Sequence, residues 1–473
     1  MIKNNAMFIR RELLTRLCSQ LQDGGSRELI DRIPLEMKPR NNSHIRCCVH
    51  KDRAVLKYKL MACLGFSIED ETDELTPLSE YVKIAEEKQG ISDVRLTVVD
   101  EACLSCSPGN YVVTNMCQSC DGRPCQVNCP KDAINFSSGR AQIDTDDCVN
   151  CGLCMNYCPF HAIIFTPVPC EAVCPVDAIS KDKNGIANIN HDLCVFCGRC
   201  FEACPYGAVM EKSHIVNIYQ ALKSEEEMIA LVAPALYGQF AATPEQVHAA
   251  ILQLGFDKVV EVAEGAVITA QKEAQELEEE ILGNPDKKMT TSCCPSYQEL
   301  VIKHLPKLKD KLSTTKTPLY YTSEQVKQEN KEAKMVFISP CMAKKHEVFS
   351  TQVADYTLNF EELGSMLAAS EIEMHNININ PKKENLEARV FSYSGGVTEM
   401  VKNYLMSEKN LNNTKLSGFS KENIKELKAL ALGKGEYNFY EIMACENGCI
   451  NGCNTIAKPS MAKRQILKYS TNN

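Results

Sequence analysis

Cysteines are unevenly distributed along this chain of 473 residues, and their distribution limits the fold more than any other feature. Sixteen of the 26 cysteines lie between Cys103 and Cys204, none lies in residues 205–292, and six follow from Cys293 onward. A chain of this length can bury a sizeable core without disulfide bonds. Cysteines at this density therefore favour metal binding or redox chemistry in a reducing compartment.

The cysteine-rich region repeats one short pattern four times. Cys-Pro-x-x-Ala, followed by Ile or Val, begins at Cys129, Cys158, Cys174 and Cys204. Two copies close a complete C-x2-C-x2-C-x3-C-P run, the pattern with which bacterial ferredoxins bind pairs of [4Fe–4S] clusters. In this pattern three thiolates of a run bind one cluster and the fourth binds the other. The two complete runs are Cys148, Cys151, Cys154, Cys158 and Cys194, Cys197, Cys200, Cys204.

The spacing of the copies predicts two tandem ferredoxin-like α+β domains, residues 101–167 and 168–214. The first two copies are 29 residues apart and the last two are 30 apart, whereas only 16 residues separate the second from the third. This arrangement predicts three ligand sets. They are Cys117, Cys120, Cys125 and Cys158; Cys148, Cys151, Cys154 and Cys129; and Cys194, Cys197, Cys200 and Cys174.

Three alternatives stay open for the remaining cysteines of this region. Cys103, Cys106, Cys170 and Cys204 could bind a fourth cluster, so we expect three or four accessory [4Fe–4S] clusters. In a competing scheme the two complete runs pair directly across the insertion. C-x2-C pairs also bind zinc, but the three-plus-one spacing with Cys-Pro disfavours it.

The sequence changes character after residue 214, and residues 215–473 alternate between short apolar runs and helical patterns. Strands are expected at residues 229–233, 258–262, 334–338 and 440–443. Helices are expected at residues 244–254, with Thr243 as N-cap, and at residues 269–282. This alternation is typical of an α/β domain. Residues 1–100 are expected to form a small, mostly helical domain of unknown role.

Three cysteine motifs lie at or near the ends of expected strands or loops of the last domain, where α/β folds place their sites. They are Thr291-Ser-Cys-Cys-Pro-Ser-Tyr297, Ser339-Pro-Cys-Met-Ala-Lys-Lys-His-Glu347 and Glu441-Ile-Met-Ala-Cys-Glu-Asn-Gly-Cys-Ile-Asn-Gly452. Four thiolates drawn from them would suffice for one more [4Fe–4S] cluster. These are Cys294, Cys341, Cys445 and Cys449.

In order and spacing, the three motifs resemble the active-site signatures of the iron-only, or [FeFe], hydrogenases. The resemblance covers residues from about 100 to 473 and extends to Val232-Ala-Pro234, Gly265 to Leu277 and Ser394-Gly-Gly-Val397. It implies a catalytic domain that reversibly reduces protons to H2 at an H-cluster. That centre is a [4Fe–4S] cubane joined through a cysteine thiolate to a diiron subcluster with CO, cyanide and azadithiolate ligands.

The resemblance also assigns residues to the active centre. The four thiolates named above would hold the cubane, with Cys449 as the bridge to the diiron unit. Lys344 would donate a hydrogen bond to a cyanide ligand. Ala233, Pro234 and Met443 would line the diiron pocket.

A proton path is implied as well. Cys293 would exchange protons with the azadithiolate amine, because a thiol near its normal pKa can both give and accept a proton. The path would continue through Glu273 and Ser313 to Glu276 and solvent. Glu273 and Glu276 lie three residues apart on an expected helix and so share a face.

The chain departs from the family at several positions. Ser339 stands where methionine is common, Tyr297 replaces a tryptophan, and Glu280 stands where arginine is frequent. Cys453 and Asn454 replace glycines. These differences suggest a less-studied branch and leave the implied cluster ligands intact.

Partners and location follow from the same expectations. The resemblance implies ferredoxin or a similar low-potential carrier as electron partner, H2 and protons as substrates, and maturases that install the diiron unit. The net charge of -9 argues against nucleic-acid binding. No apolar run approaches the 18–20 or so residues that span a bilayer. We therefore expect a cytoplasmic protein of anaerobic hydrogen metabolism.

Three other functions remain as alternatives. An H2 sensor of this family usually lacks the Cys293-type proton donor and adds a signalling domain. A hydrogenase-like iron–sulfur assembly protein keeps the cubane cysteines but lacks the full diiron pocket. A subunit of an electron-bifurcating complex would share all of the motifs.

Five cysteines have no assigned role. Cys47 and Cys48 form either a metal or redox site or, as the simpler reading, a partly buried pair in a helical domain. Cys18 and Cys63 are expected in the core. Cys453 has no predicted role.

Overall fold

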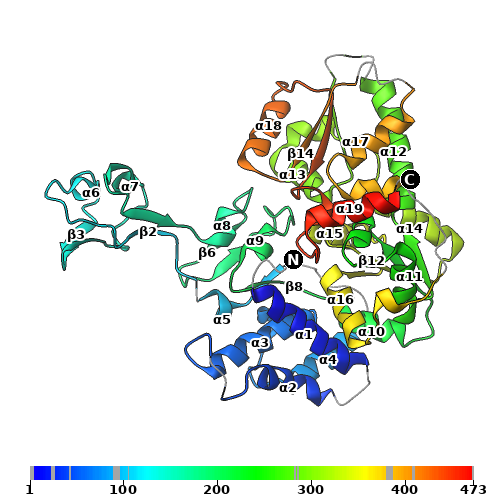
Figure 1. The fold of residues 1–473 in the computed structure, drawn as a ribbon, viewed down its shortest axis with the longest axis horizontal. Coiled ribbons are helices and arrows are strands. Elements are labelled where there is room, and N and C mark those ends of the chain that lie inside the picture. The colour runs from blue at the N-terminus through cyan, green and yellow to red at the C-terminus, as the bar shows by residue number, and fades with distance from the viewer. Residues whose placement is uncertain are drawn as a thin grey trace.

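The N-terminal region is helical in the computed structural model of the chain (Figure 1). The structure describes residues 5–22, 27–41, 44–88, 96–104, 106–281, 284, 287–379, 387–406 and 411–470. Cys18 and Cys63 are buried, as predicted. The helices of this domain are α1 (Asn5–Gln22), α2 (Glu28–Met37), α3 (Val49–Cys63), the 3-10 turn η1 (Ile68–Asp70) and α4 (Leu78–Glu87).

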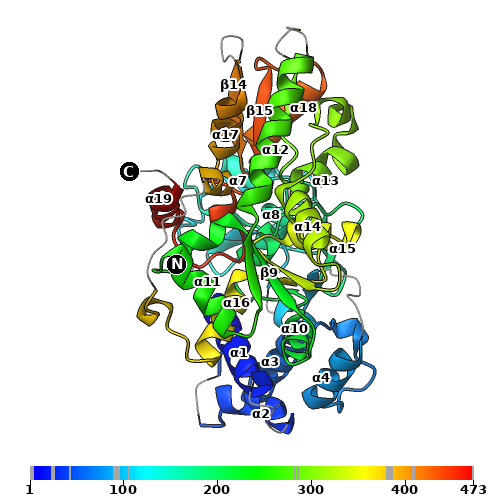
Figure 2. The same ribbon diagram turned by 90° about the vertical axis from the view of Figure 1, so that its right-hand side faces the viewer.

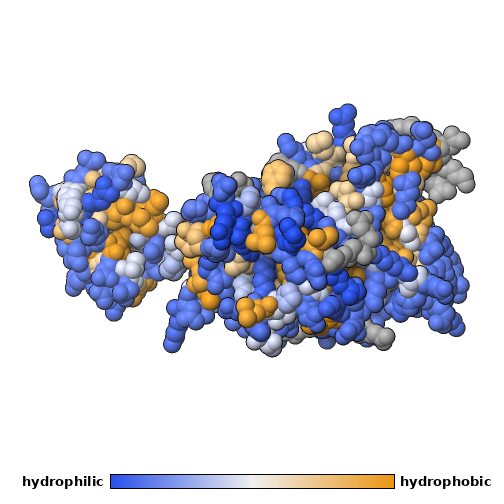
Figure 3. All heavy atoms as spheres, turned by 90° about the horizontal axis from the view of Figure 1, so that it is seen from below, coloured by the Kyte–Doolittle hydropathy of each residue, from blue (hydrophilic) through white to orange (hydrophobic). Residues whose placement is uncertain are grey.

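The first ferredoxin-like unit forms a separate lobe that projects from the rest of the molecule (Figures 1 and 3). Two antiparallel strand pairs, β2 with β5 and β3 with β4, enclose its cysteine loops. Its elements are β2 (Asn110–Val113), α6 (Pro124–Val127), β3 (Ile134–Ser137), β4 (Arg140–Ile143), α7 (Leu153–Tyr157) and β5 (Ile163–Thr166).

The second ferredoxin-like unit joins the lobe to the body. Its β6 and β7 form an antiparallel pair, and β8 pairs with β1 (Leu96–Val98), which precedes the expected domain boundary at residue 100. The N-terminal domain and the second unit therefore share a small sheet. The elements are α5 (Asp100–Cys103), α8 (Pro169–Ala172), β6 (Ile179–Lys181), β7 (Ala187–Ile189), α9 (Arg199–Ala203) and β8 (Val209–Glu211).

The C-terminal region is an α/β domain with two parallel sheets (Figure 2). One has the strand order β10-β9-β12-β13 and the other has the order β11-β15-β14. All residues of β9 and β15 are buried, which explains the continuous apolar run of β9. In β15 the buried Glu441 is the one charged residue, and its carboxylate accepts the N–H groups of Gly395 and Thr398. The four predicted strands are all present. The strands are β9 (Met228–Val232), β10 (Lys258–Glu261), β11 (Met289–Thr290), β12 (Lys334–Ile338), β13 (Tyr356–Leu358), β14 (Asn413–Ser417) and β15 (Phe439–Met443).

Helices cover both sheets of this domain. The structure describes sixteen helical segments in this domain. They are α10 (Ile215–Leu222), η2 (Pro234–Gly238), α11 (Pro244–Gln253), α12 (Ala263–Glu276), η3 (Leu277–Ile281), α13 (Pro295–His304), η4 (Pro306–Lys311), α14 (Pro318–Glu329), α15 (Met342–Thr351), α16 (Phe360–Ala369), η5 (Met374–Asn376), η6 (Glu387–Ser392), α17 (Gly396–Tyr404), α18 (Lys421–Ala431), η7 (Cys449–Asn451) and α19 (Pro459–Ser470).

One of the two predicted helices is correct and the other has wrong bounds. Thr243 caps α11 through a capping box with Gln246, as its sequence indicates. The helix expected at residues 269–282 instead begins at Ala263, and its last turn, η3, is π-helical. The sequence did not predict this earlier start because the segment contains Gly265, and glycine disfavours helix in isolation. It is needed here since a Cβ atom would collide with the Pro318 carbonyl of α14.

The N-terminal helices pack directly on the α/β domain through one continuous apolar core. Helix α1 lies against α16, and the buried Glu361 of α16 accepts Arg10 Nε at 2.6 Å and Arg11 Nε at 2.8 Å. The N-terminal domain therefore packs against the α/β domain and is not held to it by chain connection alone. Across the described ranges, no helix is long and apolar enough to cross a membrane.

Candidate active site

The three cysteine motifs of the α/β domain converge on one cavity. They follow the carboxyl ends of β11, β12 and β15, and Ala233-Pro234 follows β9 at the same level as Ile338 of β12. Because the strands are parallel, these ends face one another between the two sheets. The walls of the cavity include Cys294, Cys341, Cys445 and Cys449.

Local backbone structure fixes these four cysteines. Cys294 and Cys341 are the N-cap residues of α13 and α15, and Cys341 Sγ accepts the Lys344 N–H at 3.4 Å. Gly448, between the other two cysteines, has φ +86°, and a Cβ atom there would lie 2.7 Å from Ser394 N. Glycine at this position therefore lets the Ser394-Gly-Gly-Val397 segment pack against the cysteine loop.

Cys293 lies in the cavity wall beside a buried carboxylate. Glu273 of α12 is fully buried, and its Oε1 accepts the Ser292 N–H at 3.0 Å. Its Oε2 has no hydrogen-bond partner among the residues that the structure describes. Burial raises the pKa of Glu273 to about 7. Burial, and then the nearby Glu273 carboxylate, raises the pKa of the Cys293 thiol well above its usual value. Both groups are therefore poised to hold a proton.

Glu276 and Ser313 are in direct contact, one turn along α12. Ser313 Oγ donates to Glu276 Oε2 at 2.7 Å, and the Thr314 N–H donates to Oε1 at 2.9 Å. Glu276 is half-buried and so stands nearer to solvent than Glu273. The structure brings Ser313 to Glu276 but, within the described ranges, joins neither of them to Glu273 by a hydrogen bond.

Ser292 fills part of this gap, and sequence reasoning missed it. Its hydroxyl donates to the Thr315 carbonyl at 2.6 Å, and its Oγ also lies 3.3 Å from Glu273 Oε1. It therefore connects the buried carboxylate to the segment that carries Ser313. The only sequence signal was its place next to Cys293 in the first motif.

Lys344 presents a cation to the same cavity. Its Nζ pairs with Glu347 Oε2 at 2.8 Å, and Glu347 also accepts the Thr317 hydroxyl. Burial lowers the pKa of Lys344, but Glu347 and the thiols of Cys341 and Cys293 outweigh it, so that the net shift is upward. The side chain therefore stays charged beside the four thiols.

The predicted apolar wall residues line this site, and so does one of the family departures, Ser339. Ala233, Pro234, Met443 and Ser339 line the cavity. The Tyr297 hydroxyl donates to Thr290 Oγ1 at 2.9 Å and is fully buried behind it. Glu280 is exposed and lies 3.7 Å from Lys287, away from the cavity.

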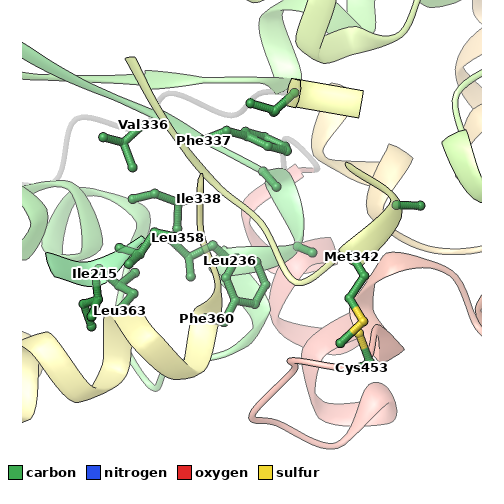
Figure 4. Packing of buried hydrophobic residues seen from close by; sticks show 14 of the residues in the cluster. Ile215, Leu236, Val336, Phe337, Ile338, Met342, Leu358, Phe360, Leu363 and Cys453 are labelled. Carbon is green, nitrogen blue, oxygen red and sulfur yellow. The ribbon is translucent and has the colours of Figure 1, made fainter. Parts of the chain in front are cut away.

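Cys453 and Asn454 fill the boundary between the cavity loops and the second ferredoxin-like unit. Cys453 is buried, lies next to Met342 (Figure 4), and contacts the Pro340 carbonyl at 3.6 Å. Asn454 Nδ2 donates to Glu211 at 2.9 Å. These larger side chains thus occupy an interdomain contact where glycine would leave space.

The sixteen accessory cysteines fall into four groups. Two cavities in the first unit are lined by separate sets, Cys117, Cys120, Cys125 with Cys158 and Cys148, Cys151, Cys154 with Cys129. Their grouping matches the tandem scheme and not the direct pairing of the two complete runs. In the described residues no group of three His, Cys, Asp or Glu is arranged to hold a single metal ion.

The second unit contains the other two groups. Burial, and then Cys197, Cys194 and Cys174, raises the pKa of Cys200 well above its usual value. Burial, and then Cys204 and Cys103, raises the pKa of Cys170 to about 11, and Cys106 acts on Cys103 in the same way. Cys103, Cys106, Cys170 and Cys204 therefore gather as one set, the arrangement that the sequence left open.

A backbone feature explains the repeated Cys-Pro-x-x-Ala pattern. The residue before each alanine has a positive φ, which turns the alanine N–H back toward the cysteine. That N–H lies 3.4, 3.1 and 3.3 Å from Sγ in the copies that begin at Cys158, Cys174 and Cys204. Such inward amides form concavities that suit anionic clusters. The positive-φ residues are Asp132, His161, Asp177 and Gly207.

The set around Cys197 adjoins the active-site cavity. Phe196 and Cys197 contribute to the cavity wall, and the Phe196 ring stacks on His346 of α15 at 4.1 Å between centroids. A Cβ atom at Gly198 would lie 2.6 Å from Cys453 Sγ. The loop that carries this set therefore packs tightly against the loops that carry Cys341 and Cys449.

Comparison with known families assigns this cavity. The sequence model described as the iron-only hydrogenase large subunit, C-terminal domain, matches residues 226–453, which contain all three motifs. Residues 226–453 belong to the iron-only hydrogenase family. Ahead of this hydrogenase domain, the LdpA Fe-S cluster-binding domain matches residues 164–215 and the 4Fe-4S binding domain matches residues 141–164. The chain is therefore an iron–sulfur protein in both parts.

Known hydrogenases resemble the chain at low identity. Iron hydrogenase 1 of Clostridium pasteurianum is 26% identical over 305 residues, which are 52% of this chain and 53% of that protein. The chain thus spans about half the length of this relative. The periplasmic [Fe] hydrogenase large subunit of Nitratidesulfovibrio vulgaris is 26% identical over 66% of this chain and 85% of its own length. A solved [FeFe]-hydrogenase variant from Chlamydomonas reinhardtii is 19% identical, with a TM-score of 0.42, and covers 54% of this chain and 88% of that one.

The residues around the cavity fit the centre that the family implies. Four thiols from three motifs line one cavity, and the half-buried Lys344 lines it with them. Cys293 adds a fifth thiol that stands beside a carboxylate rather than within the set. A cubane with an attached anionic diiron unit would match this combination of soft donors, positive charge and apolar wall.

Proposed function

We propose that the protein is a hydrogenase that interconverts H2 with protons and electrons, using ferredoxin or a similar low-potential carrier. The single observation that carries the proposal is the cavity itself. It combines four thiols for a cubane, the cation Lys344 and the separate thiol Cys293 next to Glu273. Family membership of the domain supports hydrogen as the substrate.

We assign the cluster ligands from this arrangement. Cys294, Cys341, Cys445 and Cys449 would hold the cubane, and Cys449 would also reach the diiron unit. When bound, the H-cluster supplies the metal chemistry of H2 formation and cleavage. Lys344, oriented by Glu347, would donate to a cyanide ligand. Ala233, Pro234 and Met443 would exclude water from that end of the cavity.

Protons would travel along α12. The Cys293 thiol would exchange a proton with Glu273, whose raised pKa of about 7 allows both directions at neutral pH. Ser292 connects Glu273 to the Thr315 carbonyl, next to the segment from which Ser313 reaches Glu276. Glu276 is half-buried and would release the proton to solvent.

Electrons would pass through the accessory clusters in spatial order. The projecting first unit, residues 101–167, would take them from the carrier into its two clusters. In the second unit, residues 168–214 together with Cys103 and Cys106 from the preceding segment, the set with Cys204 would lie next. The set with Cys197 would deliver the electrons to the cubane of residues 215–473. This path uses four accessory clusters. It passes through three of the four proposed domains and does not involve residues 1–100.

The presence of the proton donor disfavours the non-catalytic alternatives. An assembly protein would not need a proton donor such as Cys293 or its carboxylate partner Glu273. Sensors of this family usually lack the Cys293-type donor. We infer that maturases install the diiron unit. A cytoplasmic location stays a prediction, since one relative is named as periplasmic.

Infrared spectroscopy with an H2 assay tests the proposal. The full chain would be purified without oxygen, loaded with iron and sulfide, and matured with a synthetic diiron precursor. We expect CO and cyanide bands, and H2 release from reduced ferredoxin. Absence of those bands would contradict the cofactor assignment, and bands without turnover would favour a sensor.

A further inference from the structure

The N-terminal domain places one buried cation against helix α9 of the second ferredoxin-like unit and another against the loop that follows this helix. Lys59 of α3 is 2% exposed, and its Nζ donates to the Tyr206 carbonyl at 2.9 Å. Arg10 of α1 lies 4.1 Å above the centre of the Phe201 ring. Helix α9 connects the cysteine set around Cys197 to Cys204. Both cations therefore lie where the two clusters proposed for the second unit would be neighbours.

The Lys59 ammonium is packed onto the loop that holds Cys204. A Cβ atom at Gly207 would lie 2.9 Å from Lys59 Nζ, so the ammonium rests against the Tyr206-Gly207 peptide. The next residue, Ala208, directs its N–H to Cys204 Sγ at 3.3 Å. A negative charge on the Cys204 thiolate raises the pKa of Lys59, against the larger effect of burial. The cation is thus separated from a proposed cluster ligand by a single turn of backbone.

The two cations differ in how far they are neutralised. Arg10 is paired with Glu361 of α16. Lys59 forms no ion pair with any residue in the described part of the chain, and its partner is an uncharged carbonyl. Burial is the main cause that lowers the pKa of Lys59 to about 8, so the ammonium form still dominates at neutral pH. Lys59 therefore contributes an uncompensated positive charge in a region of low dielectric.

We propose that the N-terminal domain is a redox-tuning module, and that Lys59 raises the reduction potential of the cluster held by Cys103, Cys106, Cys170 and Cys204. Reduction adds a negative charge to a [4Fe–4S] cluster, and a fixed cation nearby stabilises the reduced form. Lys59 and Cys204 are both buried, and salt screens buried charges much less than exposed ones. The inference rests on the proposed cluster set of the second unit.

The domain holds Lys59 in place through several contacts. Lys51 of the same helix pairs with Glu101 of α5, two residues before Cys103. Ser213, just after β8, donates its N–H to the Ala62 carbonyl at 3.0 Å. Helix α3 thus contacts the chain both before Cys103 and after Cys204, which fixes the position of the charge relative to that set.

A redox titration followed by electron paramagnetic resonance tests the inference in the full, cluster-loaded chain. Lys59→Gln removes the charge but keeps a donor for the Tyr206 carbonyl. Lys59→Met serves as a second variant, and Lys59→Arg keeps the charge. Lys57→Met is the matched control, because Lys57 lies on the same helix but is paired with Glu71. A Cys106→Ser chain identifies the signal of the cluster concerned.

We expect Lys59→Gln and Lys59→Met to lower the equilibrium constant for reduction of that one cluster by tenfold or more, which is 59 mV for one electron. Lys59→Arg and Lys57→Met should stay close to the parent chain. An unchanged potential in both neutral variants, with full iron content, would overturn the inference. An equal shift of every cluster would do so too. If Cys106→Ser changes neither iron content nor any signal, the cluster assignment fails instead.

Discussion

The carboxylate of Glu273 accepts the backbone N–H of Ser292 at 3.0 Å, and this bond holds it beside the thiol of Cys293. The contact joins α12 to the first cysteine motif across the cavity wall. It makes Glu273 the group best placed to exchange protons with that thiol. Its other oxygen, Oε2, has no hydrogen-bond partner among the described residues, so this atom is free to bind a proton.

Glu273→Gln should lower H2 turnover by about 10²-fold or more, because a general acid–base group is removed. Iron content and the infrared bands should not change, since Glu273 is not a proposed ligand. Glu279→Gln is the matched control, because Glu279 is exposed one turn beyond Glu276. The H2 assay and an iron determination on the same samples measure both effects. Unchanged turnover would show that Glu273 is not part of the proton path.

Cys293→Ala should abolish most turnover and leave the iron content intact. Cys294→Ala, one residue away, should instead lose about four irons per chain, as expected for a cubane ligand. Comparing these neighbours separates a proton donor from a cluster ligand in one experiment. Loss of iron from the Cys293 variant would show that it is a ligand and that the assignment is wrong.

Arg389→Met should lower the free energy of unfolding by about 3–5 kcal/mol, because it removes the guanidinium partner of the buried Glu261 and leaves that carboxylate with His248, at 3.5 Å. Arg389 Nε donates to Glu261 Oε2 at 2.8 Å, and both residues are buried. Arg389 lies in η6, whose last residues, Phe391 and Ser392, line the cavity. Urea denaturation followed by circular dichroism measures the effect. The double variant Arg389→Met/Glu261→Gln should recover part of the loss, and failure to recover any would mean that the pair is not the cause.

Gly198→Ala should disturb the contact between the second ferredoxin-like unit and the active site. Its φ is +76°, and the new Cβ atom would lie 2.6 Å from Cys453 Sγ. Gly152→Ala is the control, since its φ is +81° but its closest contact is the flexible Tyr111 hydroxyl. We expect a larger fall in thermal midpoint for Gly198→Ala. Adding Cys453→Gly should restore much of the difference, and no restoration would argue against a clash with Cys453.

Cys48 should react with iodoacetamide at a lower pH than an ordinary thiol. It precedes α3, and the Lys51 N–H, with smaller contributions from Cys47 and the His50 N–H, lowers its pKa. A lowered pKa means that more thiolate, the reactive form, is present at a given pH. Peptide mapping of the native chain over a pH series gives the midpoint. We expect the midpoint of Cys48 to rise in a Cys47→Ser chain, because the Sγ atoms are 3.9 Å apart. A Cys48 midpoint at the usual thiol value would contradict the expectation.

Much of the local structure could be predicted from the sequence because its causes are local. The buried run at β9 has no polar residue, and that at β12 has none after Lys334, so neither pattern suits an amphipathic helix. Thr243 and Gln246 form their capping box within four residues. The cysteine loops repeat because each Cys-Pro-x-x-Ala copy turns through its own positive-φ residue.

The sequence alone determined the chemistry available to this protein: thiols in ferredoxin spacing, three cysteine motifs and the residues that accompany them. Only the tertiary structure decided which groups meet. Cys103 and Cys204 gather in one set although a hundred residues separate them, and Lys59 reaches that set from another domain. Ser292 completes the contact to Glu273 across two elements. Burial and long-range packing create these pairings, and no periodicity along the chain encodes them.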